Sequence, residues 1–162
     1  MAIAHSFAKN MGLYGERTGA VHIVCANKDI KTKIASQMKV KIRASYSNPP
    51  IHGGRIASAI LNDPQLTAEW KEELKKVSGR IIEMRQVLRA ELERIGTPGT
   101  WNHITDQIGM FSYTGLTEKQ CEYLIKKQRV YLIKNGRISM AGINAGNVKR
   151  LAAAMKEAIQ NA

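Results

Sequence analysis

Residues 6–19 read SFAKNMGLYGERTG, and this stretch carries the chemistry from which the rest of the sequence can be interpreted. It sets Ser6 three residues before Lys9 and Arg17 eight residues after it, among glycines that let backbone and side chains converge on an anion. A lysine in an enclosed site can lose its proton and attack an aldehyde, while a serine and an arginine hold a phosphate nearby. The same residues also fit a solvated polar turn, so the assignment needs a longer match.

The composition is that of a globular protein. The chain has 162 residues, 44% of them hydrophobic, which is enough for one ordinary domain with a real core. No apolar run approaches the roughly 20 residues of a membrane-spanning helix, and the first residues lack the pattern of a secretory signal, so we expect a soluble protein with no membrane partner. Cys25 and Cys121 lack Cys-x-x-Cys spacing, which supports neither a zinc site nor a disulfide framework and fits a reducing compartment.

The net charge of +12 is large for this length and needs an explanation. A basic excess is compatible with nucleic acid, with anionic ligands, or with a missing acidic segment. The lysines along residues 28–43 could bind nucleic acid electrostatically. However, the cations are scattered, aromatic residues make up only 6%, and no nucleic-acid motif appears. We therefore expect no nucleic-acid partner, and keep a basic binding module as the rival hypothesis from another class.

Apolar spacing predicts the elements of the first part of the chain. The β-branched run of residues 20–26 indicates a buried strand, which needs neighbours on both sides. Apolar residues recur every four positions over 28–44, which predicts a helix with lysines on its other face. A longer helix over 64–95 begins at the N-cap Asp63 and ends before Gly96. The helix is longer than the globular norm, so we expect it to run past the edge of one layer and to join two domains. Its apolar stripe is continuous and is expected to face a core along its length.

Residues 77–162, the last part of the chain, are predicted to form a self-contained α+β layer. By contrast, residues 1–76 offer too few elements to bury their own apolar strand and look like part of something larger. The elements predicted for the last part are a strand over 110–114, a helix opened by the capping box of Thr117 and Gln120, a hairpin of strands 130–133 and 137–141, and a helix from about residue 146.

The sequence provides a match longer than the spacing of Ser6, Lys9 and Arg17. Residues 6–17 strongly resemble the cofactor-lysine segment of the aspartate aminotransferase family, which belongs to the class I aminotransferases that depend on pyridoxal 5′-phosphate. The resemblance continues through 42–50, 99–111 and 136–142, so it spans essentially the whole chain. It implies an α/β fold, the fold type I of these transferases. On this basis 1–76 is the end of the large cofactor-binding domain, and 77–162 is the small α+β C-terminal domain.

The resemblance also implies roles at the cofactor. In the family, the lysine matching Lys9 forms an imine with the cofactor and later moves the proton between the substrate Cα and the cofactor carbon. Residues matching Ser6 and Arg17 bind the cofactor phosphate. Tyr14 helps to shape the cofactor pocket, and Ser47 matches a residue near the cofactor contact between subunits. A packed aromatic for Tyr14 and a turn hydroxyl for Ser47 are the alternatives from the residues alone.

Substrate contacts follow from the same resemblance. The arginine matching Arg137 clamps the substrate α-carboxylate, and the one matching Arg43 takes the distal carboxylate from the neighbouring subunit of a homodimer. A guanidinium suits both tasks because it is planar, permanently charged and forked to match a carboxylate. Phe111 matches a residue lining the substrate side, although a phenylalanine in a strand is as often part of a core.

Some positions depart from the family or lie outside it. His5 stands where a glutamine is common. His103 and Asp106 are too few to form a metal site, so we favour a structural role for them. The family's aspartate at the cofactor ring nitrogen, its stacking aromatic, and its asparagine and tyrosine at the cofactor oxygen all precede the lysine motif. We therefore expect a truncated chain with half a site, inactive or nearly so by itself.

The function implied by the resemblance is exchange of an amino group between L-aspartate and 2-oxoglutarate in a ping-pong cycle, giving oxaloacetate and L-glutamate. The partners are then dicarboxylic amino acids and 2-oxo acids. An aromatic amino acid aminotransferase of the same family would keep Lys9, Arg17 and Arg137, but Arg43 in its motif favours dicarboxylates. A cytoplasmic location is expected, with the mitochondrion left open.

Overall fold

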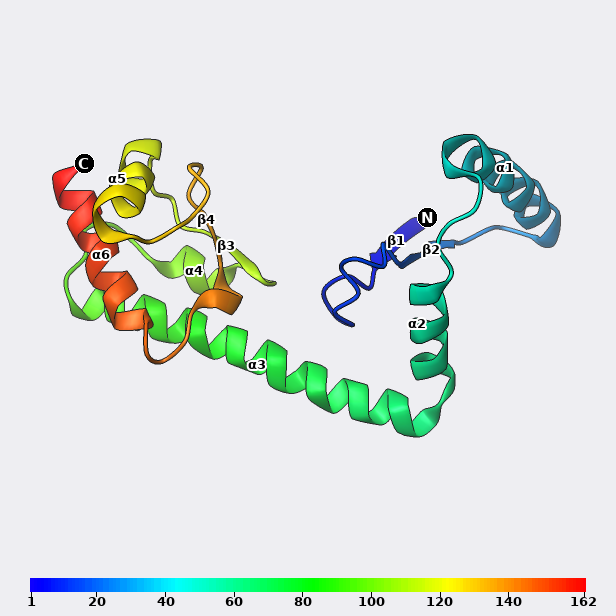
Figure 1. The fold of residues 1–162 in the computed structure, drawn as a ribbon, viewed down its shortest axis with the longest axis horizontal. Helices are drawn as coiled ribbons and strands as arrows, with labels where there is room; N and C mark the ends of the chain where they lie inside the picture. The colour runs from blue at the N-terminus through cyan, green and yellow to red at the C-terminus, as the bar shows by residue number, and fades with distance from the viewer. The chain divides into compact units, whose positions relative to one another are not determined.

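The computed structural model describes all 162 residues, which divide into two compact units, Met1–Leu74 and Lys75–Ala162. The boundary falls within helix α3 (Pro64–Arg94), the long helix predicted from the sequence and drawn in green in Figure 1. That 1–76 and 77–162 are parts of two family domains remains a prediction, because compactness does not say what each unit belongs to. No helix combines the length and the apolar composition that a membrane crossing requires.

The first unit opens with a two-stranded antiparallel sheet of β1 (Ala2–Ser6) and β2 (Gly19–Ile23). The predicted strand is therefore present, but its predicted burial is wrong. Val21 is 59% exposed, and Val24 just beyond the strand is 62% exposed. The reason is that a sheet of two strands has a single neighbour for each strand and gathers too little apolar surface to cover its own faces.

Helix α1 (Lys28–Tyr46) confirms the second predicted element of this unit. Asn27 caps it, because its side chain accepts a hydrogen bond from the backbone N–H of Ile30 at 2.9 Å. No residue of α1 is buried, so its apolar face finds no complete cover within this unit. Helix α2 (His52–Asn62) follows and was not predicted; it buries Gly53 and Ala57.

Helix α3 begins as predicted, since Asp63 Oδ1 accepts hydrogen bonds from the N–H groups of Gln65 at 2.8 Å and Leu66 at 3.0 Å. The expectation that its whole apolar stripe faces a core is wrong. Leu66 and Val77 are exposed, and burial of the stripe is complete only towards the C-terminal end, where Leu88 and Leu92 have no exposed surface. The second unit alone supplies enough apolar side chains to cover the helix.

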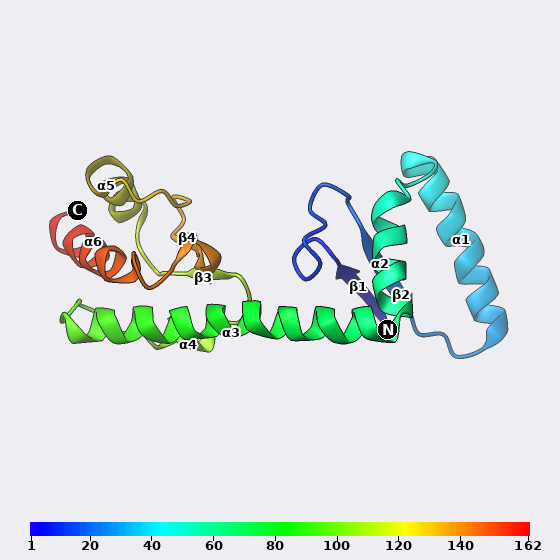
Figure 2. The same ribbon diagram turned by 60° about the horizontal axis from the view of Figure 1, so that its bottom comes forward.

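The second unit packs around the C-terminal end of α3. Figure 2 shows α5 and α6 side by side in this unit. Helix α5 opens with the predicted capping box, in which the Thr117 hydroxyl accepts from the Gln120 N–H and the Gln120 side chain accepts from the Thr117 N–H. The elements after α3 are α4 (Asn102–Asp106), β3 (Phe111–Tyr113), α5 (Glu118–Gln128), β4 (Arg137–Ser139), the 3-10 turn η1 (Met140–Gly142) and α6 (Val148–Asn161).

Strands β3 and β4 pair antiparallel, with Phe111 opposite Ser139 and Tyr113 opposite Arg137. The predicted hairpin is wrong in its pairing, because residues 130–133 form no strand. The expected turn is present, since the Gly136 N–H donates to the Ile133 carbonyl at 2.9 Å and Gly136 has a positive φ of 86°. Beyond the turn, however, β4 pairs with β3, which comes from earlier in the chain.

Leu88 anchors the core of the second unit, and its neighbour Val87 offers a matched control. Leu88 is 0% exposed, whereas Val87 is 36% exposed on the other side of the same helix turn. We expect Leu88→Ala to lower the free energy of unfolding of this unit by about 2–5 kcal/mol. Val87→Ala should change it by less than about 1 kcal/mol. Denaturant unfolding, followed by the fluorescence of the buried Trp101 in a Trp70→Phe background, measures both; equal losses would contradict this description of the core.

Candidate functional site

The connection between β1 and β2 brings the motif residues together. The register sets Ser6 opposite Gly19, and the Phe7 N–H donates to the Thr18 carbonyl at 3.0 Å, which closes the neck of the loop. The Phe7 carbonyl in turn accepts from Met11 at 3.3 Å, which folds the segment after the neck into a tight turn. Strand pairing therefore places the two ends of the motif side by side.

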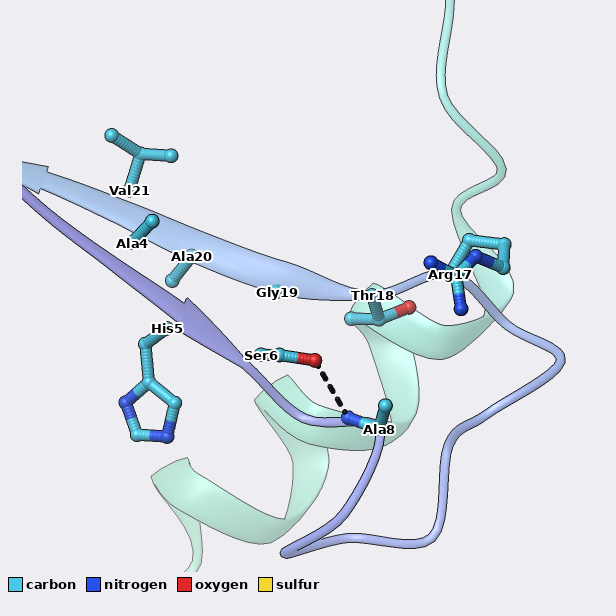
Figure 3. A pocket seen from close by; sticks show the side chains of 9 residues that line it. All are labelled: Ala4, His5, Ser6, Ala8, Arg17, Thr18, Gly19, Ala20 and Val21. Carbon is cyan, nitrogen blue, oxygen red and sulfur yellow. Dashed lines mark hydrogen bonds between the residues drawn. The ribbon is translucent and has the colours of Figure 1, made fainter. Parts of the chain in front are cut away.

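A hollow of about 290 Å³ lies at this neck. Ser6 and Arg17 line it from the two ends of the loop, as Figure 3 shows. The Ser6 Oγ accepts from the Ala8 N–H at 3.2 Å, so its own hydrogen remains available to a ligand. No aspartate or glutamate is among the residues that line the hollow, which are Ala4, His5, Ser6, Ala8, Arg17, Thr18, Gly19, Ala20 and Val21.

Arg17 is held in an unusual backbone conformation. Its φ is 54°, in the left-handed region that side chains other than glycine rarely adopt. One guanidinium nitrogen, Nη1, donates to the Tyr14 carbonyl at 3.0 Å, and the guanidinium makes no ion pair. Most of its donors are therefore available to an anion. Such a residue, strained and lacking an acidic partner, is typical of a binding position.

Lys9 lies on the same loop but outside the lining of the hollow. Its Nζ sits 4.0 Å from the centroid of the Tyr14 ring, a cation–π contact between two of the predicted site residues. The lysine is exposed, so the enclosure assumed in the sequence argument is not supplied by the first unit. The physical reason is the one that leaves β2 exposed, since a two-stranded sheet cannot wall off its own loop.

Two supports of this loop were missed in the sequence. An added Cβ at Gly53 would lie 2.6 Å from Glu16 Cβ and closer still to Thr18 Oγ1, so α2 packs directly against the turn that carries Arg17. The signal was the pair of glycines opening a helix, which is costly unless something approaches closely. On the other side of the loop, the indole N–H of Trp70 donates to the Asn10 carbonyl at 2.8 Å, next to Lys9.

Arg137 and Phe111 form a second group, in the second unit. They lie on the paired strands β4 and β3, and the Arg137 guanidinium carbon sits 3.8 Å from the centroid of the Phe111 ring. The Phe111 ring is 37% exposed, so the alternative of a core phenylalanine is wrong. The guanidinium makes no hydrogen bond or ion pair. Stacked on a ring, it keeps its N–H edge free for a carboxylate.

The remaining predicted residues lie apart from both groups. Arg43 is exposed on the last turn of α1, and its carbonyl accepts from the Ser47 N–H at 3.2 Å. Ser47 is also exposed, with a positive φ of 61° at the end of the helix. No hydrogen bond or ion pair joins either side chain to the loop of Lys9. His103 is structural, as predicted, because its Nε2 lies 3.1 Å from the Thr114 carbonyl.

Comparison with known proteins identifies the motifs. A model of the family described as aminotransferase class I and II matches residues 1–155. The cytoplasmic aspartate aminotransferase of Schizosaccharomyces pombe is 52% identical over 98% of this chain and 39% of its own length. The solved aspartate aminotransferase of Trypanosoma cruzi is 47% identical, with a TM-score of 0.92 over 100% of this chain and 41% of its own.

A third relative carries a cofactor. The solved aromatic-amino-acid aminotransferase of Burkholderia pseudomallei, covalently bound to pyridoxal phosphate, is 40% identical and has a TM-score of 0.91. The match covers 97% of this chain and 39% of that protein. The chain therefore spans about two fifths of the length of the relatives it matches, and its mixed helix and sheet structure corresponds to the C-terminal portion of their fold.

The contact of Gly53 with the Arg17 turn can be tested with its neighbour Gly54, where an added Cβ meets nothing within 4 Å. Gly53→Ala should displace the turn and weaken the binding of inorganic phosphate by about tenfold, the loss expected for one charge-assisted hydrogen bond. Gly54→Ala should leave it within about twofold, because the neighbouring space is open. A titration with inorganic phosphate, followed by the NMR signal of the Ala8 backbone amide, measures the phosphate affinity of both variants. Equal affinities in the two variants would show that α2 does not position the turn.

Proposed function

Because this chain belongs to the class I and II aminotransferases, we propose that it is the C-terminal portion of an aspartate aminotransferase. Such an enzyme transfers the amino group of L-aspartate to 2-oxoglutarate and releases oxaloacetate and L-glutamate. The observation that carries the proposal is the identity of 52% to a cytoplasmic aspartate aminotransferase over nearly the whole chain. A cytoplasmic location, as in that relative, is part of the proposal.

The cofactor of this proposal is pyridoxal 5′-phosphate, and the residues of the first unit fit it. The hollow at the β1–β2 neck combines the Ser6 hydroxyl and the Arg17 guanidinium with a lining free of carboxylates, which suits a phosphate dianion. When bound, the cofactor supplies an aldehyde to an amine and a ring that accepts an electron pair from the substrate Cα. Ser6 and Arg17 would hold the phosphate, and Lys9 would bond to the aldehyde carbon.

Lys9 has a second task in this proposal. The Lys9 amine would take up the proton that leaves the substrate Cα and would deliver it again to complete the transfer. Tyr14 bears on both tasks, since its ring lies against the Lys9 Nζ and limits where the amine can move. The Lys9 side chain is flexible and is held here by its contact with the Tyr14 ring, which suits an amine that has to reach two different carbon atoms in turn.

Two arginines would define the substrate. Arg137 grips the α-carboxylate with the N–H edge that the Phe111 ring leaves uncovered. Arg43 grips the distal carboxylate from a second copy of the chain in a homodimer, with Ser47 beside it. This agrees with the exposure of Arg43 and with its lack of any acidic partner. A site with an arginine at each end of the substrate selects dicarboxylates over monocarboxylates.

The chain holds half of the chemistry that this reaction needs. No carboxylate lines the hollow, and the family's aspartate that protonates the cofactor ring nitrogen precedes the lysine motif. Without that protonation the ring is a poor electron acceptor. That aspartate has to come from sequence outside these 162 residues. An aromatic amino acid aminotransferase is the second candidate, favoured by the likeness to the Burkholderia pseudomallei protein. It ranks lower because Arg43 would have no carboxylate to bind.

The role of Lys9 is tested by joining residues 1–162 to the preceding part of the Schizosaccharomyces pombe relative, adding pyridoxal phosphate and reducing with borohydride. We expect mass spectrometry of peptides to find the cofactor on Lys9, because reduction fixes an amine to the aldehyde it has met. Lys9→Ala should lose both the label and the turnover. Lys28→Ala, an exposed lysine on α1, is the control and should keep both. Undiminished labelling of the Lys9→Ala protein at another lysine, with turnover, would refute the assignment.

The 162 residues without the joined part test whether they are half a site. Alone, with added cofactor, they should give no turnover of L-aspartate, since the ring nitrogen lacks its partner. Rates within the ordinary enzyme range of about 1–10³ s⁻¹ from the short chain would contradict this.

Dicarboxylate preference should depend on Arg43. In the joined chain, Arg43→Ala should lower kcat/KM for aspartate by about 10²- to 10⁴-fold, the loss for a buried charge pair with one partner removed. It should change kcat/KM for phenylalanine far less, because phenylalanine has no distal carboxylate. Lys41→Ala, an exposed cation on the same helix, is the control for net charge. Equal losses for the two amino donors would count against aspartate as the substrate.

A further inference from the structure

Arg85 is buried in the second unit without a carboxylate. It is 3% exposed and makes no ion pair, and burial lowers the pKa of its guanidinium. A buried charge of this kind is costly unless hydrogen bonds replace its hydration. Four neutral acceptors do so here, and all of them come from one short segment of the chain. They are the carbonyls of Ile104 at 2.6 Å, Gly109 at 2.9 Å and Phe111 at 2.7 Å, and the Ser112 hydroxyl at 3.2 Å.

Few packed side chains order the segment that Arg85 holds, and its other support is Gln107. The Gln107 amide donates to the Tyr113 carbonyl at 3.0 Å and accepts from the Tyr113 N–H at 2.7 Å and the Ser112 hydroxyl at 3.1 Å. The segment runs from α4 to β3 and exposes its middle, where Ile108 is 97% exposed and Gly109 has a positive φ of 97°. A loop with so few packed side chains would ordinarily be mobile. The two Nη atoms of Arg85 reach both ends of it, so the planar fork works as a fixed bracket between α3 and the start of β3.

Arg85 and Arg137 both contact Phe111. The Phe111 carbonyl accepts from Arg85, and the Phe111 ring carries the Arg137 guanidinium at 3.8 Å. Arg137 itself has no ion pair or side-chain hydrogen bond to fix its direction. The Phe111 ring therefore bears on where its N–H edge points, and the Phe111 backbone is held on one side by the pairing of β3 with β4 and on the other by Arg85.

We propose that Arg85 is a positioning residue for the substrate carboxylate, acting through the backbone of Phe111 on the direction of the Arg137 guanidinium. This rests on the role proposed above for Arg137. Loss of Arg85 should weaken substrate capture more than the proton transfer at Lys9, because Arg85 touches neither the substrate nor the reacting atoms.

The 162-residue chain provides a test that needs no turnover. A proton stacked over an aromatic ring is shifted upfield, so the Arg137 side-chain N–H signal reports its contact with Phe111; Arg137→Lys identifies the signal and Phe111→Leu gives its unstacked position. We expect Arg85→Met to move the signal to the unstacked position. Arg89→Met, a same-helix arginine bonded to Glu93 and Thr105, should leave it in place. A folded Arg85→Met chain with an unmoved signal overturns the proposal.

Should Arg85→Met fail to fold, Arg85→Lys keeps the charge but cannot reach both ends of the segment from one nitrogen, and it should shift the signal part of the way. An unmoved signal there overturns the proposal equally. In the joined chain, Arg85→Met should raise KM for aspartate by about 10- to 100-fold, as misplacement of a binding group does, with kcat within about threefold. An Arg137→Lys protein with unchanged KM would instead refute the role of Arg137, which separates the two failures.

Discussion

The arrangement of Ser6 and Arg17, the residues proposed to bind a phosphate, depends on one glycine. An added Cβ at Gly19 would lie 2.5 Å from the His5 carbonyl oxygen, so β2 can pair with β1 at this point only if the residue has no side chain. The pairing sets Ser6 opposite Gly19 and closes the loop that follows. Because the loop is closed at its neck, a hydroxyl from one end and a guanidinium from the other line the same hollow. The pairing of β1 with β2 thus brings Ser6 and Arg17 to the same hollow, although they lie eleven residues apart in the sequence.

The arginines of this chain differ in their partners, and three of them, Arg80, Arg85 and Arg150, donate to backbone carbonyls within the second unit and make no ion pair. Arg89 and Arg94 pair with glutamates on their own helix, Glu93 and Glu91. The Arg89–Glu93 pair is partly exposed, and such pairs add little to stability. The arginines to which a binding role is assigned lack a carboxylate: Arg17 bonds a carbonyl and Arg137 stacks on a ring. A carbonyl or a ring fixes a guanidinium without neutralising it, whereas a carboxylate would compete with the ligand. Two of the 25 cationic side chains, those of Arg17 and Arg137, are therefore left without a neutralising carboxylate, which agrees with the binding roles proposed for them.

Local patterns were predictable from the sequence and non-local pairings were not. The cap at Asp63 and the capping box of Thr117 depend on residues within one helical turn, and both were correct. The pairing of β4 with β3 and the exposure of β2 depend on what else the unit contains, and both were missed. The candidate site residues came from resemblance to a family, since the spacing alone also fitted a polar turn. Arg85 had a signal that went unused, because it lies between Met84 and Leu88 on the buried side of α3, where a charge is out of place.

The hydrogen bond from the Trp70 indole to the Asn10 carbonyl has an optical consequence. Indole emission responds to the polarity and hydrogen bonding around the ring, and this ring touches the backbone beside Lys9. The other tryptophan, Trp101, is 5% exposed in the core of the second unit. Each unit thus carries one tryptophan, and a change in wavelength or intensity assigned to one of them says which unit a ligand or a denaturant has reached.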